Sequence, residues 1–351
     1  VAVQQTIPAL NRLIAGSSNR EIKQQARAVL GRLTMQSMLG AEDLAMYEAR
    51  QQQMPPYEAR VSYIDGAGLQ LIMLSWQRPD GKLKILNVLY QDQWGIKECY
   101  GVDAVDLEHW EKLVHDLEEQ EVGCFVAPLE YGCSLVLEAR ALNRRTRRKL
   151  PVAYAVWRPL IEAGTPAEKK KKSTRQSPPP EFNAEAQKLA EHGDELYQRA
   201  EFSSWLYDSI KHIEPYIMRY WSLSDMENEM LRPVRNTRSR RGKTAHREKL
   251  LDELVSEALQ SLVDEQWREL YARRLLRQAA LFRFARRDQD ADLAYAVAAM
   301  LHPASHVPPG EQPFLRKMLR ISIEQGPLRL MMDVLSSGSL ESLPINIVND
   351  L

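Results

Sequence analysis

Four side chains in and beside residues 57–101 have the types needed for catalysis. Asp65 and Asp92 each follow a strand-like run, where a carboxylate could act as a base or bind a cation. Cys99 and His109 could supply a nucleophile and its base, since such pairs are assembled by the fold and not by sequence order. No EF-hand, HExxH or dinucleotide-binding pattern surrounds them, and turn formation alone explains both aspartates. An enzyme using these four residues is the third of three hypotheses.

A second chemistry is offered by three clusters of lysine and arginine at residues 144–149, 169–172 and 235–243. Each falls where we predict a loop or a helix end, so each is expected to be exposed. Clustered cations neutralise phosphates and release counterions, which gives salt-sensitive binding without sequence preference. The second hypothesis is therefore a nucleic-acid-associated protein with these candidate contacts: Arg144, Arg145, Arg147, Arg148, Arg235, Arg238, Arg240, Arg241 and Lys243. Solvated loops are the alternative, because no recognition signature interleaves aromatic residues with these charges.

The composition limits both ideas. The 351 residues include 47 lysines plus arginines and 47 aspartates plus glutamates, so any attraction to nucleic acid must be local. Cys99, Cys124 and Cys133 form no CxxC pair and have no histidine at ligand spacing, which argues against a disulfide framework and a zinc site. We expect buried free thiols in a reducing compartment, no bound metal and no cofactor.

The apolar pattern indicates where the chain resides. No run approaches the roughly 20 apolar residues of a membrane span, and the N-terminus lacks the pattern of a signal peptide. We therefore expect a cytoplasmic protein without a membrane partner. The chain opens at Val1, partway into a helical pattern, as a fragment or a processed form would.

The elements that must position these residues begin with a change of period. Residues 57–101 alternate in strand fashion and contain turn-forming clusters at 65–68, 79–81 and 92–95, which predicts a four-stranded antiparallel meander. Its alternation, with polar Gln70, Ser75, Lys82, Lys84 and Asn87, predicts one buried and one partly wet face. Trp76, Trp94 and Tyr63 are expected as large anchors. A helix over 102–120 should lay its stripe of Leu107, Trp110, Leu113, Val114 and Leu117 on this sheet, and helices over 128–145 and 151–164 complete the domain.

The rest of the chain predicts a flexible linker followed by helices. Residues 165–181 are rich in lysine and proline and offer no aliphatic side chain beyond Ala167, so burial cannot offset their ordering entropy. Residues 182–335 carry helical stripes, with Asp264 as one cap, and predict an antiparallel bundle. Residues 336–351 read as a loosely held tail. The fold class is therefore α+β and predominantly α-helical, with domains over 1–54, 55–164 and 182–335.

The N-terminal pattern resembles one HEAT repeat. The resemblance lies in Ile7-Pro8-Ala9-Leu10 of a first helix and in Asn19, Glu21-Ile22-Lys23, Ala26, Leu30-Gly31 and Leu33 of a second. The family has Asp where Asn19 stands and Val-Arg at Ile22-Lys23, and the match covers about a tenth of the chain. It implies binding of protein partners through stacked helices. The first hypothesis is thus a non-catalytic interaction scaffold for an unidentified protein partner, and enzymatic activity is left undecided with a leaning against it.

Overall fold

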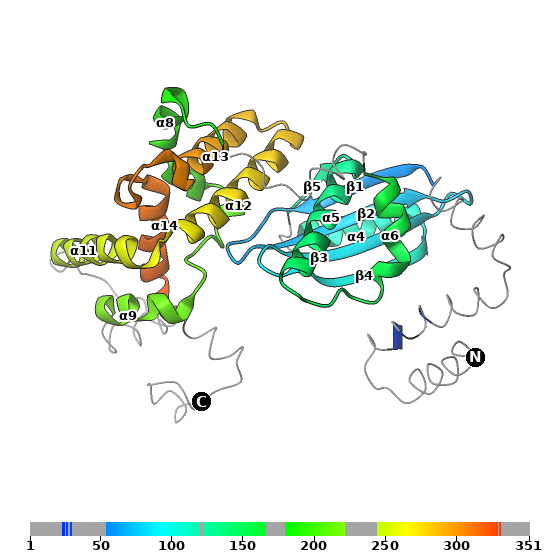
Figure 1. Ribbon diagram of the computed structural model, residues 1–351, viewed down its shortest axis with the longest axis horizontal. Coiled ribbons are helices and arrows are strands. Elements are labelled where there is room, and N and C mark those ends of the chain that lie inside the picture. The colour runs from blue at the N-terminus through cyan, green and yellow to red at the C-terminus, as the bar shows by residue number, and fades with distance from the viewer. Residues whose placement is uncertain are drawn as a thin grey trace. The chain divides into compact units, whose positions relative to one another are not determined.

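The computed structural model describes residues 23, 24, 26, 29, 54–119, 123–165, 180–221, 244–328 and 330. The chain forms two compact units. The sheet unit consists of Val1–Tyr63 and Gly68–Ser177, and the helical unit consists of Ile64–Ala67 and Pro178–Leu351. The predicted α+β class is confirmed, because the described residues form one antiparallel sheet and are otherwise mostly helical (Figure 1).

The sheet confirms the predicted meander and extends it by one strand. Its strands are β1 (Pro56–Ser62), β2 (Leu69–Gln77), β3 (Leu83–Gln91), β4 (Gly95–Val105) and β5 (Cys124–Ala127). The spatial order is β4-β3-β2-β1-β5 with antiparallel neighbours throughout. Gly81 and Gly95 adopt φ of 79° and 101°, a region that favours glycine, at the turns on either side of β3.

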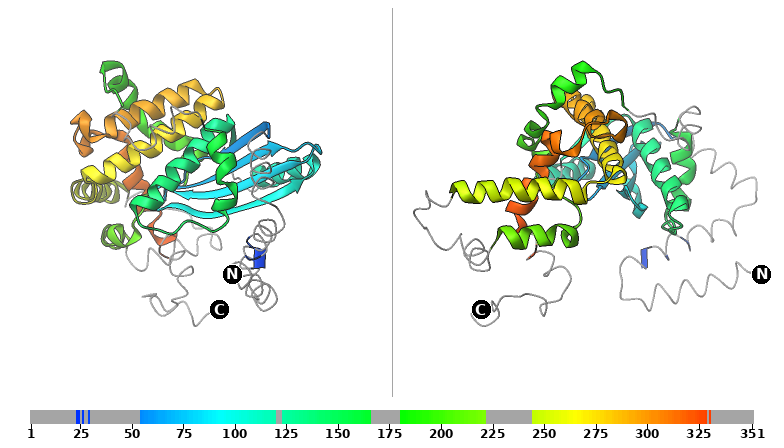
Figure 2. Two further views of the ribbon diagram at one scale, coloured as in Figure 1. Left: turned by 45° about the vertical axis from the view of Figure 1, so that its right-hand side comes forward. Right: turned by 60° about the vertical axis from the view of Figure 1, so that its left-hand side comes forward.

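Helices cover both faces of this sheet. Figure 1 and the turned views of Figure 2 show α5 (Leu129–Arg145) and α6 (Tyr154–Ala163) on one face and α4 (Leu107–Glu119) on the other. On the α5 face, a Cβ on Gly132 would lie 2.5 Å from Leu74 and 3.7 Å from Ile72, so the absent side chain lets α5 approach closely. On the same face the rings of Trp76 and Trp157 stack with centroids 6.3 Å apart.

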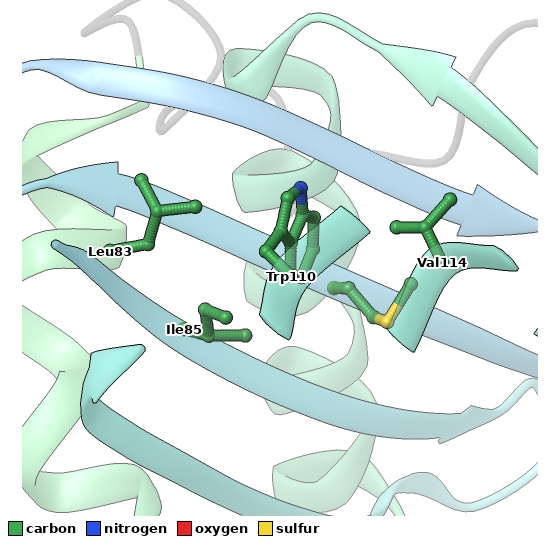
Figure 3. Close-up of a cluster of buried hydrophobic side chains, with 5 residues drawn as sticks. Leu83, Ile85, Trp110 and Val114 are labelled. Atoms are coloured by element: carbon green, nitrogen blue, oxygen red, sulfur yellow. The ribbon is translucent and has the colours of Figure 1, made fainter. Parts of the chain in front are cut away.

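The α4 face forms a compact apolar cluster, shown in Figure 3. Trp110 and Val114 of α4 pack on Met73, Leu83 and Ile85 of the two central strands, and all five side chains are buried. The Trp110 indole N–H donates to Glu58 Oε1 at 2.7 Å, so the polar atom of this ring is satisfied as well. The predicted inward stripe of α4 is thus confirmed for Trp110 and Val114.

The prediction of one buried and one partly wet face is confirmed at β4, because Tyr100 and Val102 on the α4 face are 50 % and 43 % exposed. The polar residues of β2 and β3 do not mark that face. Gln70 and Lys84 lie on the α5 face and Ser75 and Asn87 on the α4 face, and all four are at most 6 % exposed.

The helix expected over 102–120 begins five residues later than predicted. Residues 102–105 belong to β4, and α4 starts at Leu107. The strand continues because Val105 and Val102 pair with Leu83 and Ile85 across a local irregularity. Leu107 and Leu113 are 42 % and 38 % exposed, so they lie outside the inward stripe.

The helical unit follows the predicted stripes closely. Its α-helices are α8 (Ala184–Ala190), α9 (Ile210–Tyr220), α11 (Thr244–Leu262), α12 (Glu265–Phe284), α13 (Asp288–Leu301) and α14 (Pro313–Glu324). Short 3-10 helices cover Gly193–Gln198, Ala200–Phe202, Pro303–Ser305 and Pro309–Glu311. Asp264 caps α12 as predicted, with its carboxylate accepting the Trp267 N–H at 2.7 Å. The core includes an aromatic group centred on Trp205, whose ring lies 4.8 Å from Phe202 and 6.0 Å from Tyr271 and Phe314.

One segment of the helical unit comes from far earlier in the sequence. Ile64–Ala67, the residues between β1 and β2, belong to this unit. The indole N–H of Trp205 donates to the carbonyl of Ile64 at 2.9 Å, and the Arg274 guanidinium donates to the carbonyl of Gly66 at 2.6 Å. The turn predicted at residues 65–68 is therefore held by side chains of the helical unit.

Several predictions fall outside the described residues. Of the HEAT-like pair, only Lys23, Gln24, Ala26 and Val29 are described; all four are helical, and Ala26 is buried. Nearly all of the predicted linker and the whole of the predicted tail lie outside the described part as well. These predictions stay predictions.

Within the described residues, no helix combines the length and apolar character that crossing a membrane requires.

We predict that Trp110→Ala lowers the free energy of unfolding of the sheet unit by about 3–5 kcal/mol, because it removes a buried aromatic ring and leaves a cavity. Urea denaturation followed by circular dichroism measures this. Leu113→Ala, on the same helix and 38 % exposed, is the matched control and should cost less than about 1 kcal/mol. Equal losses in the two variants would show that α4 does not anchor on the sheet as described.

Candidate nucleic-acid interface

The first basic cluster lies where α5 ends. Arg147 has a φ of 56°, in the left-handed region. Its N–H donates to the carbonyl of Arg144 at 3.3 Å, and the Arg148 N–H donates to that of Asn143 at 2.9 Å, which is the hydrogen-bond pattern of a Schellman motif. Glycine is favoured at this left-handed position, because a Cβ there costs about 1–2 kcal/mol. The chain keeps an arginine here despite that penalty.

Five cations surround this helix end: Arg144, Arg145, Arg147, Arg148 and Lys149. All are exposed, and none forms an ion pair with another residue in the described part of the chain. The carbonyl of Leu142 accepts the N–H and the hydroxyl of Thr146, both at 2.9 Å, so backbone and threonine groups already cap the last turn. The helix dipole favours positive charge at this end. It does not require that five of six consecutive residues be cationic.

A buried asparagine fixes the neighbouring turn against this helix end. Asn143 is 1 % exposed; its Oδ1 accepts the Ile96 N–H at 2.7 Å, and its Nδ2 donates to the Ile96 carbonyl at 3.2 Å. The side chain thus pairs with both backbone groups of the residue, as a neighbouring strand would. A Cβ on Gly95 would lie 2.3 Å from Asn143 Oδ1, so glycine is required beside it. The beginning of β4 is therefore tied to the end of α5.

This contact places an aromatic ring within the cluster. The Thr146 hydroxyl donates to the carbonyl of Trp94 at 3.2 Å, and the guanidinium carbon of Arg148 lies 4.2 Å from the centre of the Trp94 ring. Trp94 remains 41 % exposed. The expectation of Trp94 as a buried anchor is wrong, because the residue lies in the turn between β3 and β4 and not within a covered strand. The cluster therefore combines cations with an exposed aromatic surface.

We call this arrangement of Trp94 with Arg144, Arg145, Arg147, Arg148 and Lys149 the α5 basic patch. The other two predicted clusters cannot be compared with it, since residues 169–172 and 235–243 lie outside the described residues. Arg235, Arg238, Arg240, Arg241 and Lys243 are among them. An exposed group of cations with a ring can bind anions and stack on planar groups, and both are features of single-stranded nucleic acid.

Two residues of the enzyme hypothesis, Cys99 and His109, lie on opposite sides of the sheet. Cys99 pairs with Val88, which lies opposite Ile72 on the face covered by α5. His109 is an exposed residue of α4, which covers the other face. Burial also raises the pKa of the Cys99 thiol to about 12, so the thiol remains protonated near neutral pH. The sheet unit does not bring this nucleophile and base together.

The two aspartates belong to separate turns. Asp92 lies in the β3–β4 turn and is 8 % exposed, and its N–H donates to the carbonyl of Gly68 at 3.0 Å. Asp65 belongs to the segment held by the helical unit. Among the described residues, no group of three or more histidine, cysteine or acidic side chains is placed to hold a metal ion. The structure therefore supplies no geometric support for chemistry at Asp65 and Asp92.

Sequence reasoning missed the roles of two residues: Trp94, which belongs to the α5 basic patch, and Asn143, which supports it. Asn143 follows Val136 and Ala139 at helical spacing, and a polar residue in a buried stripe is a signal for a specific hydrogen bond. Trp94 directly precedes a turn glycine, outside the alternating part of either strand, which is a signal against a core position. Only the fold shows that these two residues meet the basic helix end.

We predict that Arg147→Gly raises the free energy of unfolding by about 1 kcal/mol, because glycine adopts the left-handed conformation without the steric penalty. Thermal and urea unfolding measure the change. The control is Arg145→Gly, one residue inside the helix, which should lower the stability by about 1 kcal/mol. A destabilising Arg147→Gly would mean that the arginine side chain itself supports the fold.

The buried thiols give a second prediction. Burial raises the pKa of Cys99 and of Cys133 to about 12 from a usual value of 9.0, whereas Cys124 is partly exposed. A thiol-specific dye near neutral pH should modify Cys124 rapidly in the folded protein and all three cysteines in denaturant. Because the folded-state pKa values are raised, stability should fall as the pH rises from about 9 towards about 12. Rapid labelling of folded Cys99, read by mass spectrometry, would contradict its burial.

Comparison of the chain with protein-family models, with curated proteins and with solved structures found no match. No residue role is therefore transferred to this chain from a relative. The resemblance of residues 7–33 to one HEAT repeat stays a prediction from the sequence.

Proposed function

We propose that the chain is a non-catalytic macromolecule-binding protein and that the α5 basic patch binds single-stranded nucleic acid. The observation that carries this proposal is the stack of Arg148 on the exposed ring of Trp94, 4.2 Å from its centre, among four further exposed cations. The cations contact phosphates, and the ring contacts bases. Both kinds of contact tolerate any sequence.

The electrostatic part of the proposal follows from the free charges of the patch. Cations already paired with carboxylates contribute little to anion binding, as at Arg219, which donates twice to Glu257 at 2.8 Å. The patch cations have no such acidic partner among the described residues. A polyanion therefore binds them without first breaking an internal ion pair. Because the chain as a whole is neutral, the attraction must come from local clusters of cations such as this one.

The aromatic part selects single strands over duplexes. A base can stack on an exposed ring only when it is free of its own neighbours, which is the normal state of a single strand. Stacking of one base on an aromatic side chain contributes about 1–3 kcal/mol. The Asn143 contact with Ile96 fixes the backbone two residues from Trp94 before binding, so less backbone ordering entropy is lost there.

The protein-scaffold hypothesis concerns a different part of the chain. It rests on the HEAT-like pattern within residues 1–54, of which five residues are described. A pulldown from native extract at two salt concentrations separates the two ideas. Nucleic acid that copurifies at low salt and is lost at high salt supports the α5 basic patch, whereas a salt-resistant protein partner supports the scaffold.

We predict that Trp94→Ala weakens binding of a fluorescein-labelled oligo(dT) by about fivefold to 100-fold, because one stacked base is lost. The triple change Arg145→Ser, Arg147→Ser and Arg148→Ser should flatten the plot of log affinity against log salt by about 0.7 for each phosphate contact removed. Fluorescence anisotropy over a salt series measures both. Duplex DNA should be bound more weakly by the unaltered protein, and Trp94→Ala should leave duplex binding unchanged.

The matched control removes three exposed arginines that are already paired. Arg158, Arg219 and Arg283 bind Glu162, Glu257 and Asp292, and replacing all three by serine changes the net charge equally. This control should retain the affinity and the salt slope within about twofold. Equal losses in the two triple variants would show that net charge, and not the α5 basic patch, drives binding. Unchanged affinity in the patch variants would reject the proposed function.

A further inference from the structure

The helical unit holds residues Ile64–Ala67 in what we call the turn slot, formed by Trp205, Tyr271, Arg274 and Gln278. The backbone of Ile64 is bound on both sides: its carbonyl accepts the Trp205 indole N–H at 2.9 Å, and its N–H donates to Gln278 Oε1 at 3.4 Å. The carbonyl of Gly66 accepts from Arg274 Nη1 at 2.6 Å and from the Tyr271 hydroxyl at 3.2 Å. These contacts recognise backbone groups, so they would bind a turn of suitable shape.

The lining of the turn slot is fully buried. Trp205, Tyr271, Arg274 and Gln278 are each 0 % exposed. A buried guanidinium is costly unless it is hydrogen-bonded, and here it donates to Gly66 and lies 4.4 Å from the centre of the Tyr271 ring. The Nε2 atom of Gln278 is buried and has no hydrogen-bond partner among the described residues. The slot thus has the polar, preorganised character of a binding site and not of an ordinary apolar core.

The occupant must satisfy two steric conditions. A Cβ on Gly66 would lie 2.1 Å from the carbonyl oxygen of Ser204 and 2.8 Å from the Cα of Trp205, so the slot admits only glycine there. Ile64, two residues earlier, is 0 % exposed and fills an apolar position. The recognised pattern is therefore an apolar residue followed two positions later by glycine within a turn.

We propose that the turn slot is a peptide-binding site for glycine-containing turns, and that residues 64–67 are its internal ligand. Binding of residues 64–67 in the turn slot does not depend on the covalent connection through residues 165–181. Fragments produced by cutting that connection stay together, and the slot accepts the same turn from a separate peptide when the internal turn is impaired. This proposal is independent of nucleic-acid binding.

The first test cuts the full-length chain at a specific protease site inserted after Lys172. The two fragments of the otherwise unaltered protein should elute as one species in size-exclusion chromatography, because Ile64–Ala67 remain in the turn slot. Gly66→Ala should make the fragments separate, whereas the control Gly310→Ala should not, since no atom of the described residues lies within 4 Å of a Cβ placed there. Separation of the unaltered fragments, or association that survives Gly66→Ala, would overturn the proposal.

A second test requires only that the helical unit stays folded in the Gly66→Ala protein. A fluorescent peptide covering Arg60–Leu71 is added to the uncut Gly66→Ala protein, whose helical content is checked by circular dichroism. It should bind this variant at least tenfold more tightly than the unaltered protein, in which the internal turn competes at high effective concentration. The same peptide carrying alanine at Gly66 should not bind either protein.

A milder substitution covers the case in which Gly66→Ala unfolds the helical unit. Tyr271→Phe removes a single hydroxyl that donates to Gly66, and keeps the ring that stacks on Trp267 with centroids 3.7 Å apart. The cut protein carrying Tyr271→Phe should dissociate at lower urea than the cut unaltered protein. Absence of peptide binding to the Gly66→Ala protein, together with unchanged dissociation of the Tyr271→Phe protein, would reject the turn slot as a binding site.

Discussion

Burial of both faces of β2 and β3 is the constraint on which the sheet unit depends. Because helices exclude water from either side, each polar side chain on the central strands must find a partner inside the fold. The Ser75 hydroxyl donates to the carbonyl of Glu58 at 2.8 Å, and the amide of Gln70 donates to that of Ser62 at 3.0 Å. Asn143 meets the same requirement from the side of α5. Its pairing with Ile96 also gives the α5 basic patch its shape.

Lys84 shows how far this constraint extends. Its side chain is almost fully buried on the α5 face, where the ammonium lies 4.8 Å from the centre of the Trp157 ring and forms an ion pair with Asp103. Trp157 packs so closely on β4 that a Cβ on Gly101 would lie 2.0 Å from the ring. The ring thus contacts β4 and the lysine, and the charge is stabilised at the margin of the core. The carboxylate of Asp103 stays largely in water, so only one member of the pair is desolvated.

The extent to which the sequence predicted this fold follows from which signals are local. Periodicity and caps predicted α11 to α14 and the cap at Asp264, because those signals act within one helix. The meander was predicted from its glycine and aspartate turns. The short strand β5 carries no pattern of its own and exists because β1 offers it a free edge. The burial of Lys84 and Asn87 depends on which helices return to cover the sheet, and single strands do not encode that information.

The candidate site was predictable only in part. The cations of the α5 basic patch were apparent as a charge run, since exposure at a helix end follows from composition. The role of Trp94 was not, because residues 94 and 148 are brought together by tertiary contacts of Asn143 with Ile96 and of Thr146 with Trp94. The separation of Cys99 from His109 likewise follows from strand pairing, which decides the face on which each side chain lies. Spacing in the sequence cannot distinguish two residues that come together in the fold from two that lie on opposite faces of a sheet.

The order in which a ribosome makes this chain gives the turn at Ile64 a further significance. Ile64 and Gln278 bond to each other although they are 214 residues apart in sequence. At typical synthesis rates of about 5–20 residues per second, about 10–40 s pass between the emergence of the two residues. During that interval α12 has not yet been made, so the apolar side chain of Ile64 stays exposed on the nascent chain. Maturation of the helical unit is therefore a late event that must wait for α12.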